Sequence, residues 1–154
     1  EDLCKTGVKF KLTLAGAGPL VNEYMELAER LGVAGCVTTL SMDHQALSIA
    51  LPKHDIYVHY SLSEGVPRAI LEAMAAGLPV IVSNRCGCSL DLVKEGENGF
   101  ILSDLENPEI LRNLIIKTLE NKEKFSKKSL EIINNWTFEK SRESFESLLK
   151  TISE

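Results

Sequence analysis

Two glutamates, Glu64 and Glu72, interrupt an otherwise apolar stretch, SEGVPRAILEAMAAGLPVIV at residues 63–82. An ionised carboxylate inside a core helix costs several kcal/mol unless a partner compensates its charge. Glu72 therefore either turns to solvent or meets a group that donates hydrogen bonds. An ionised carboxylate only accepts hydrogen bonds, so hydroxyls are its natural neutral partners, and two vicinal hydroxyls are typical of a sugar or a ribose.

The backbone between the two glutamates suits an anion. We expect Pro67 at the first position of a helix over 67–77, and Gly65 lets a ligand approach the chain closely. The free N–H groups from Val66 to Ala69 would then point at a phosphate. Sugar, phosphate and ribose together describe a nucleotide sugar. On the residues alone, an exposed loop position for Glu64 and a solvent-facing helix position for Glu72 stay open as alternatives.

Apolar runs alternate with helical periodicity along the first two thirds of the chain. Strands are expected at 8–16, 36–40, 55–60, 78–83 and 99–102, and helices at 19–32, 44–54 and 67–77. This alternation predicts an α/β fold: a Rossmann-like, doubly wound parallel sheet with helices on both faces. Three amphipathic helices, at 107–120, 122–136 and 137–152, are expected as a C-terminal helical tail packed against the sheet domain.

Composition narrows the function classes. The chain has 154 residues and a net charge of -5, which argues against nucleic-acid binding. No apolar stretch reaches the roughly 18 residues of a membrane span, and the N-terminus does not look like a signal peptide.

No metal site is expected from the cysteines and histidines. The four cysteines (4, 36, 86 and 88) are interpreted as reduced thiols, because Cys86-Gly87-Cys88 is too tight for a usual zinc pair. The three histidines form no ligand motif, and His59 is interpreted as a packed strand residue.

Residues 60–82 resemble the signature of retaining glycosyltransferase family 4, also called glycosyl transferase group 1, whose members have the GT-B fold. Ser61, Glu64 and Gly65 match its Pro-Ser-x-x-Glu-Gly segment, with Tyr60 in place of the proline. Glu64 and Glu72 match its Glu-x7-Glu pair, and 72–80 match its Glu-Ala-Met-Ala-x-Gly-x-Pro-Val segment. LAGAGP at 14–19 and GENGFIL at 96–102 resemble further family segments.

The chain departs from the family pattern at three places. The arginine and lysine that neutralise the diphosphate come from a segment before this chain begins. Gly87-Cys88 stands where the family has Gly-Gly, with Asp91 in place of a nearby glutamate, and Ser41 stands where it has a strand-end glycine. The last two departures suggest a subfamily variant, and the first implies an incomplete catalytic apparatus.

The resemblance implies one half of a GT-B enzyme. Residues 1–154 would be the C-terminal nucleotide-sugar-binding domain, with the N-terminal acceptor domain and the first strand of this domain absent from the chain. The implied activity is metal-independent transfer of a sugar, with retained configuration, from a nucleotide-diphosphate sugar to an acceptor glycan or lipid in polysaccharide biosynthesis. The isolated fragment is expected to be inactive.

The implied setting follows from the donor. The expected location is cytoplasmic, because the donor is a cytoplasmic metabolite, and no cofactor is expected besides the donor substrate. The acceptor would bind through the missing domain, and any peripheral membrane contact would come through the full-length protein.

The resemblance also implies a set of substrate-binding residues: Gly16, Ser41, Glu64, Gly65, Val66, Pro67 and Glu72. Arg68 is added to this set because it lies beside the expected helix start, where many relatives have an apolar residue. Glu64, the catalytic candidate, would contact the hydroxyls of the transferred sugar, and Glu72 would accept from the ribose. Gly65, Val66 and Pro67 would line the sugar and the diphosphate.

The other three residues have less specific expected roles. Gly16 would face the cleft, Ser41 would approach the base, and Arg68 would add positive charge near the diphosphate or stay a solvated surface residue.

Three other functions remain as alternatives. GAGPLV at 16–21 begins like a dinucleotide-binding loop, but Val21 stands at the third glycine position and no acidic residue ends the following strand. Another GT-B enzyme, such as an epimerase or a glycogen or sucrose synthase, would share the architecture. A non-catalytic nucleotide-sugar-binding module is the alternative from a different class.

Overall fold

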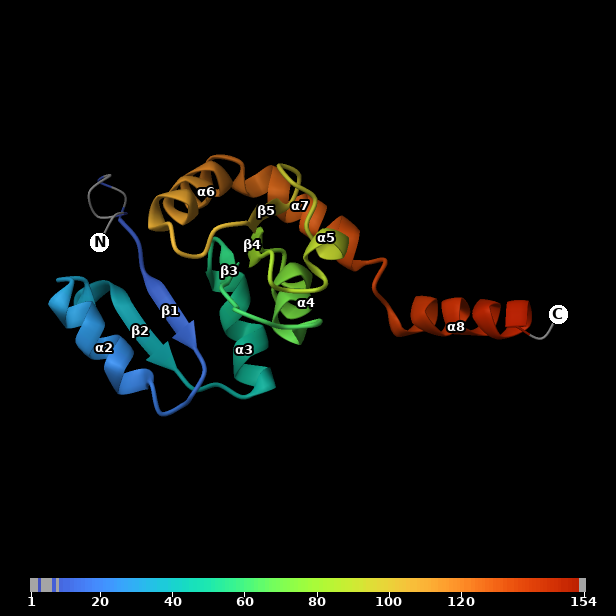
Figure 1. The fold of residues 1–154 in the computed structure, drawn as a ribbon, viewed down its shortest axis with the longest axis horizontal. Coiled ribbons are helices and arrows are strands. Elements are labelled where there is room, and N and C mark those ends of the chain that lie inside the picture. Colours follow the sequence, from blue (N-terminus) through green and yellow to red (C-terminus); the bar gives the residue numbers. More distant parts are fainter. Residues whose placement is uncertain (1–2, 4–6, 8, 153–154) are drawn as a thin grey trace. The chain divides into compact units, whose positions relative to one another are not determined.

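The computed structural model describes residues 3, 7 and 9–152 and divides the chain into two compact units, 1–50 and 51–154 (Figure 1). Cys4 and residue 8, the expected start of the first strand, lie outside the described residues. Every strand pair in both units is parallel, as the sequence predicted.

The first unit contains a two-stranded parallel sheet. Strand β1 (Leu12–Ala15) pairs with β2 (Val37–Leu40), and Leu12 lies opposite Val37. Helix α2 (Val21–Arg30) connects the strands and ends before Gly32, whose φ of 70° a side chain would disfavour. A 3-10 turn, η1 (Ala34–Cys36), leads into β2, and α3 (His44–Ala50) follows it. The strands are shorter than expected.

The second unit opens on a turn and a three-stranded parallel sheet. The 3-10 turn η2 (Leu51–Lys53) carries Pro52, so α3 stops four residues earlier than expected. Strands β3 (Tyr57–His59), β4 (Val80–Ser83) and β5 (Gly99–Leu102) lie in the order β3-β4-β5. All four residues of the central β4 are fully buried, as its apolar sequence predicted.

Gly99 is required where β4 and β5 meet. A Cβ atom at this position would lie 1.7 Å from the carbonyl oxygen of Val80. Val80 is the register partner of Gly99, so any side chain would separate the strands at the start of their pairing.

Helix α4 (Arg68–Ala75) packs on β3 and β4 through its buried residues Ile70, Ala73 and Met74. It begins one residue later than expected, because Pro67 has an extended ψ of 120° and serves as the N-cap. A short helix after the next strand, α5 (Ser89–Leu92), was not expected from the sequence.

Two helices of the C-terminal tail pack as predicted. Helix α6 (Pro108–Glu120) lies against β5, and Asn107 caps it by accepting from the N–H of Glu109 at 3.0 Å. Helix α7 (Lys122–Ile133) packs on α4 and α6 and buries Phe125.

The last helix, α8 (Phe138–Ile152), differs from the expectation of a packed tail. The predicted apolar stripe is present, but no described residue of α8 is buried. Phe138 and Ile152 are 81% and 72% exposed.

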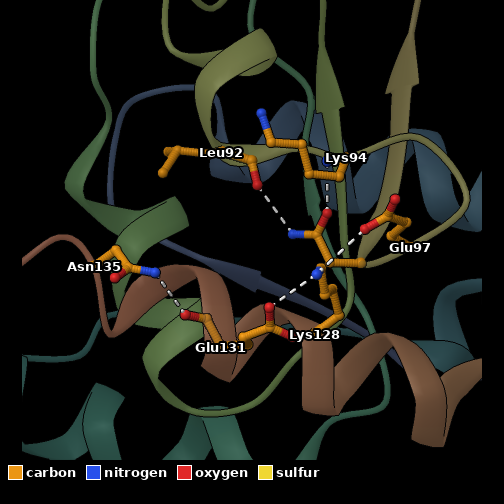
Figure 2. A network of polar contacts seen from close by, with 7 residues as sticks. Leu92, Lys94, Glu97, Lys128, Glu131 and Asn135 are labelled. Atoms are coloured by element: carbon orange, nitrogen blue, oxygen red, sulfur yellow. Dashed lines mark hydrogen bonds and ion pairs between the residues drawn. The ribbon is translucent and has the colours of Figure 1, made fainter.

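A polar network ties α7 to the turn before β5 (Figure 2). The buried Asn98 donates through Nδ2 to the carbonyl of Leu92 at 3.0 Å and accepts from the N–H of Lys94 at 2.7 Å. Lys128 of α7 pairs with Glu97 at 3.4 Å. The side-chain amide thus satisfies buried backbone groups where the chain turns. Among the residues that the structure describes, no helix has the length and apolarity to cross a bilayer.

Candidate functional site

Six of the eight predicted site residues lie in the second unit, where β3 leads into α4. Gly65, Val66 and Arg68 are exposed, and Pro67 is buried. The N–H groups of Gly65 and Val66 have no acceptor within the described part of the chain. This stretch is the carboxyl edge of a parallel sheet, where open α/β folds bind ligands.

The loop after β4 holds the backbone of Glu64 and Gly65 in place. Glu64 donates its N–H to the carbonyl of Arg85 at 3.2 Å, and its own carbonyl accepts from Gly87 at 2.9 Å. The N–H of Cys88 donates to the carbonyl of Gly65 at 3.1 Å. Three hydrogen bonds therefore join two segments that lie about twenty residues apart in the sequence.

Gly87 has a steric reason to be glycine. A Cβ atom there would lie 3.3 Å from the carbonyl oxygen of Gly65, which is closer than most such contacts. Its missing side chain lets the two loops approach.

His59, the last residue of β3, contacts Glu64 directly. Its Nε2 lies 2.6 Å from Oε2 of Glu64, and its Nδ1 lies 3.0 Å from the hydroxyl of Tyr57. Because a carboxylate only accepts, Nε2 carries the hydrogen and donates it. With a hydrogen on Nε2, Nδ1 can accept from the Tyr57 hydroxyl. The His59 side chain is 16% exposed and that of Glu64 is 43%, so the carboxylate is the end that faces solvent.

Tyr57 keeps its proton at neutral pH. Burial first, and then the negative charges of Glu64 and Glu72 with the nearby Cys86, together raise the pKa of its phenol to about 12. Glu72, on α4, is half-buried, and its negative charge contributes to the raised pKa of Tyr57.

Cys86 completes a cluster that the sequence did not predict. One ligand atom each of His59, Glu64 and Cys86 lies within 4.8 Å of the others. Burial, then Cys88 and Glu64, raises the pKa of the Cys86 thiol, which keeps it neutral. The sequence analysis expected no ligand set among the histidines and cysteines, and the fold brings together a nitrogen, an oxygen and a sulfur atom that could hold a metal.

Sequence reasoning missed His59 and Cys86 because it looked for ligands at short spacings. The signal that could have found them is the position of both residues relative to the strand ends. His59 is the last residue of a strand, and Cys86 follows the neighbouring strand, so both stand at the same sheet edge as Glu64.

The remaining two predicted residues, Gly16 and Ser41, lie in the first unit, directly after β1 and β2. The N–H of Gly16 donates to the carbonyl of Leu40 at 2.9 Å, which brings the two strand ends together. Both residues are exposed at the carboxyl edge of their own sheet.

A separate surface hollow of about 1030 Å³ surrounds the turn between α6 and α7. Its lining alternates acidic and basic side chains, among them Glu120, Lys122, Glu123 and Lys124. None of the eight predicted site residues lines it. The carboxyl edge of the β3-β4-β5 sheet is therefore the better candidate for a functional site.

Comparison with known proteins identifies a family. The model of the family described as "Glycosyl transferases group 1" matches residues 1–136. The putative glycosyltransferase EpsF of Bacillus subtilis (strain 168) is 37% identical over 82 residues, which are 53% of this chain and 21% of that protein. The Vi polysaccharide biosynthesis protein VipC/TviE of Salmonella typhi is 32% identical over 96 residues, 62% of this chain and 16% of that protein. The matched segments thus span about a fifth of the length of these relatives.

Solved structures support the same fold. The pneumococcal O-GlcNAc transferase GtfA, in complex with UDP and GlcNAc, superposes with a TM-score of 0.80 at 17% identity, covering 98% of this chain and 31% of GtfA. Anabaena Alr3699/HepE in complex with UDP gives a TM-score of 0.74 at 22% identity, covering 92% and 41%. The α/β, Rossmann-like fold predicted from the sequence is confirmed.

Proposed function

Because the chain belongs to the glycosyl transferases group 1 family, we propose that it is the donor-binding domain of a retaining, metal-independent glycosyltransferase. It binds a nucleotide-diphosphate sugar, whose sugar is transferred to a glycan or lipid acceptor. The observation that carries the proposal is the Glu64 carboxylate, held by His59 beside exposed N–H groups at the carboxyl edge of a parallel sheet.

The carboxylate of Glu64 has a free acceptor for the sugar. His59 occupies Oε2 at 2.6 Å, which leaves Oε1 to accept from hydroxyls of the transferred sugar. A fixed negative charge there also stabilises the positive charge that develops on a sugar ring as its bond to the leaving group breaks. Holding the carboxylate in one orientation before the donor binds avoids an ordering cost during the reaction.

The diphosphate is bound by the entrance to α4. The N–H groups of Gly65 and Val66 donate to its oxygens. The exposed Arg68, at the first position of α4, adds positive charge. These groups stabilise the leaving diphosphate without a divalent metal. Pro67 offers no N–H and instead sets the direction of the chain into the helix.

Glu72 and the first unit serve the nucleoside. The half-buried Glu72 accepts from the two ribose hydroxyls, which donate to a charged acceptor and so form strong hydrogen bonds. Gly16 and Ser41, exposed at the carboxyl edge of the first unit's own sheet, are proposed as further contacts of the nucleoside. The likeness to structures solved with UDP supports a nucleotide ligand.

The whole protein carries an acceptor-binding domain in addition to this chain, acts in polysaccharide biosynthesis and works in the cytoplasm, where nucleotide sugars are made. The names of relatives such as VipC/TviE support the polysaccharide role. The isolated chain binds donor but transfers little or no sugar. Measurable turnover by the purified chain would contradict the proposal that transfer also needs the acceptor-binding domain.

Ligand-observed NMR on the purified chain tests donor binding, with UDP, GDP and ADP and their glucose or mannose conjugates. We expect one nucleotide to bind selectively and its signal to be lost in Glu72→Ala. The matched control is Glu106→Ala, an exposed glutamate in the loop before α6, which should bind like the original chain. Binding that survives in Glu72→Ala would contradict the ribose role, and a folded chain that binds no nucleotide would contradict the proposal.

A further inference from the structure

The His59–Glu64–Cys86 cluster brings a nitrogen, an oxygen and a sulfur ligand atom together at one sheet edge. His59 ends β3, Cys86 follows β4, and Glu64 lies on the loop that pairs with Cys86 through an isolated parallel bridge. The backbone of all three is therefore held by sheet hydrogen bonds before any ion arrives. We propose that these three side chains form a binding site for Zn²⁺, with a fourth position open to water.

The distances suit a tetrahedral ion after a small adjustment. The three ligand atoms lie within 4.8 Å of one another. Zinc bonds of 2.0–2.3 Å place tetrahedral ligand atoms about 3.5 Å apart. Nε2 of His59 and Oε2 of Glu64, now 2.6 Å apart, must separate by about 1 Å, which the half-exposed Glu64 side chain allows.

A second group already orients the histidine. The Tyr57 hydroxyl lies 3.0 Å from Nδ1 of His59, and the two rings stack with centroids 5.9 Å apart. When zinc takes Nε2, the ring proton moves to Nδ1 and is donated to the Tyr57 oxygen. Such a partner on the far ring nitrogen is the usual support of a metal-binding histidine.

The ligand types select the metal. Sulfur and imidazole nitrogen favour Zn²⁺, whereas Mg²⁺ and Ca²⁺ prefer oxygen ligands alone. Glu64 supplies its carboxylate, and Cys86 binds as the thiolate, so its proton leaves for solvent. The balance is one Zn²⁺ bound and one proton released from the Cys86 thiol.

Zinc at this site would compete with the donor. This consequence rests on the proposed function, because it is Glu64 that would otherwise accept from the sugar hydroxyls. Zinc binding itself depends only on the cluster. If zinc binds but does not compete with the nucleotide sugar, the role given to Glu64 in donor binding fails and the metal site stands.

The test is titration of the purified chain with ZnCl₂ by calorimetry and with CoCl₂ by absorption spectroscopy, in a Cys4→Ser, Cys36→Ser background. We expect one ion per chain and a thiolate-to-cobalt charge-transfer band. Cys86→Ser should abolish the band, and His59→Gln should weaken zinc binding at least tenfold. Tyr57→Phe should weaken it by roughly 10–100-fold, as loss of a supporting partner does elsewhere.

Cys88→Ser is the matched control, because Cys88 is equally buried two residues away but lies outside the cluster. It should keep both the affinity and the band. Circular dichroism checks that each variant folds. If Cys86→Ser does not fold, the loss of zinc affinity in His59→Gln provides the test. Absence of the band in the parent chain, its survival in Cys86→Ser, or its loss in Cys88→Ser would overturn the proposal.

Discussion

The two units differ sharply in how they are packed, although both are built from parallel strands. In the second unit, every residue of β4 is fully buried and helices pack on the strands. In the first unit, Ala28 is the one buried residue among those described, and Leu12 of β1 is 45% exposed. Parallel strands normally have both faces covered. The central strand β4 of the second unit meets that requirement, and neither strand of the first unit does.

The difference explains where a preorganised site can form. The Glu64 pair is held by a strand end, by three backbone hydrogen bonds from a neighbouring loop and by a core beneath them. At the strand ends of the first unit, the N–H of Gly16 donates to the carbonyl of Leu40, the residue before Ser41. We therefore expect the second unit to hold its candidate residues more precisely than the first unit holds Gly16 and Ser41.

The largest expected effect comes from placing a side chain at the start of β5. Gly99→Ala would put a Cβ 1.7 Å from the carbonyl oxygen of Val80 and break the β4–β5 pairing. We expect the free energy of unfolding to fall by more than about 4 kcal/mol, or the chain not to fold. Urea denaturation followed by circular dichroism measures this.

Gly35→Ala in the first unit is the matched control. No atom lies within 4 Å of the added Cβ, and the residue sits in a 3-10 turn. We expect a change within about 0.5 kcal/mol. Similar losses in Gly35→Ala and Gly99→Ala would remove the contrast between the units.

A smaller effect is expected from Tyr57→Phe, and its sign depends on pH. At pH 8 the variant loses the hydrogen bond to His59, which costs about 1 kcal/mol. The pKa of Tyr57 is raised to about 12 in the folded chain from 10.0. Between pH 10 and pH 12 the unfolded chain loses the phenol proton before the folded chain does. The free energy of unfolding of the parent therefore falls over this range, by on the order of 2 kcal/mol. Tyr57→Phe has no phenol to titrate, so its free energy of unfolding does not fall for this reason.

Stability curves of both proteins from pH 8 to 12 test this prediction. We expect the destabilisation of Tyr57→Phe to shrink or reverse above pH 10. Tyr24→Phe, which changes an exposed tyrosine of α2, is the control and should stay within about 0.5 kcal/mol of the parent at pH 8. Parallel curves for Tyr57→Phe and the parent would contradict the buried position assigned to the phenol.

Much of the fold could be predicted because local patterns determined it. The bounds of β5 were predicted without error, and α4 within two residues, since Pro67 and Gly77 mark its two ends. The packing of α8 could not be predicted. Its apolar stripe indicates a helix with one apolar face, but periodicity does not say what covers that face.

The candidate site could be predicted only in part. Glu64, Gly65 and Glu72 stand in a local motif, so spacing and resemblance were sufficient. His59 was interpreted as a packed strand residue, and it is half-buried, but its contact with Glu64 depends on where β3 ends. Cys86 reaches the cluster through a bridge to Glu64, twenty-two residues away in sequence. Such contacts come from strand pairing, which no single segment encodes.

The most direct test of the central claim measures what the sugar adds to donor affinity in Glu64→Gln. Calorimetry would compare the nucleotide diphosphate with its sugar conjugate, in the parent chain and the variant. We predict that the variant binds the nucleotide diphosphate within about threefold of the parent but loses the added affinity of the sugar, about 10–100-fold, because hydrogen bonds to a charged acceptor are worth roughly 1.5–3 kcal/mol. Equal weakening of both ligands, or no change in either, would contradict the assignment of Glu64 to the sugar.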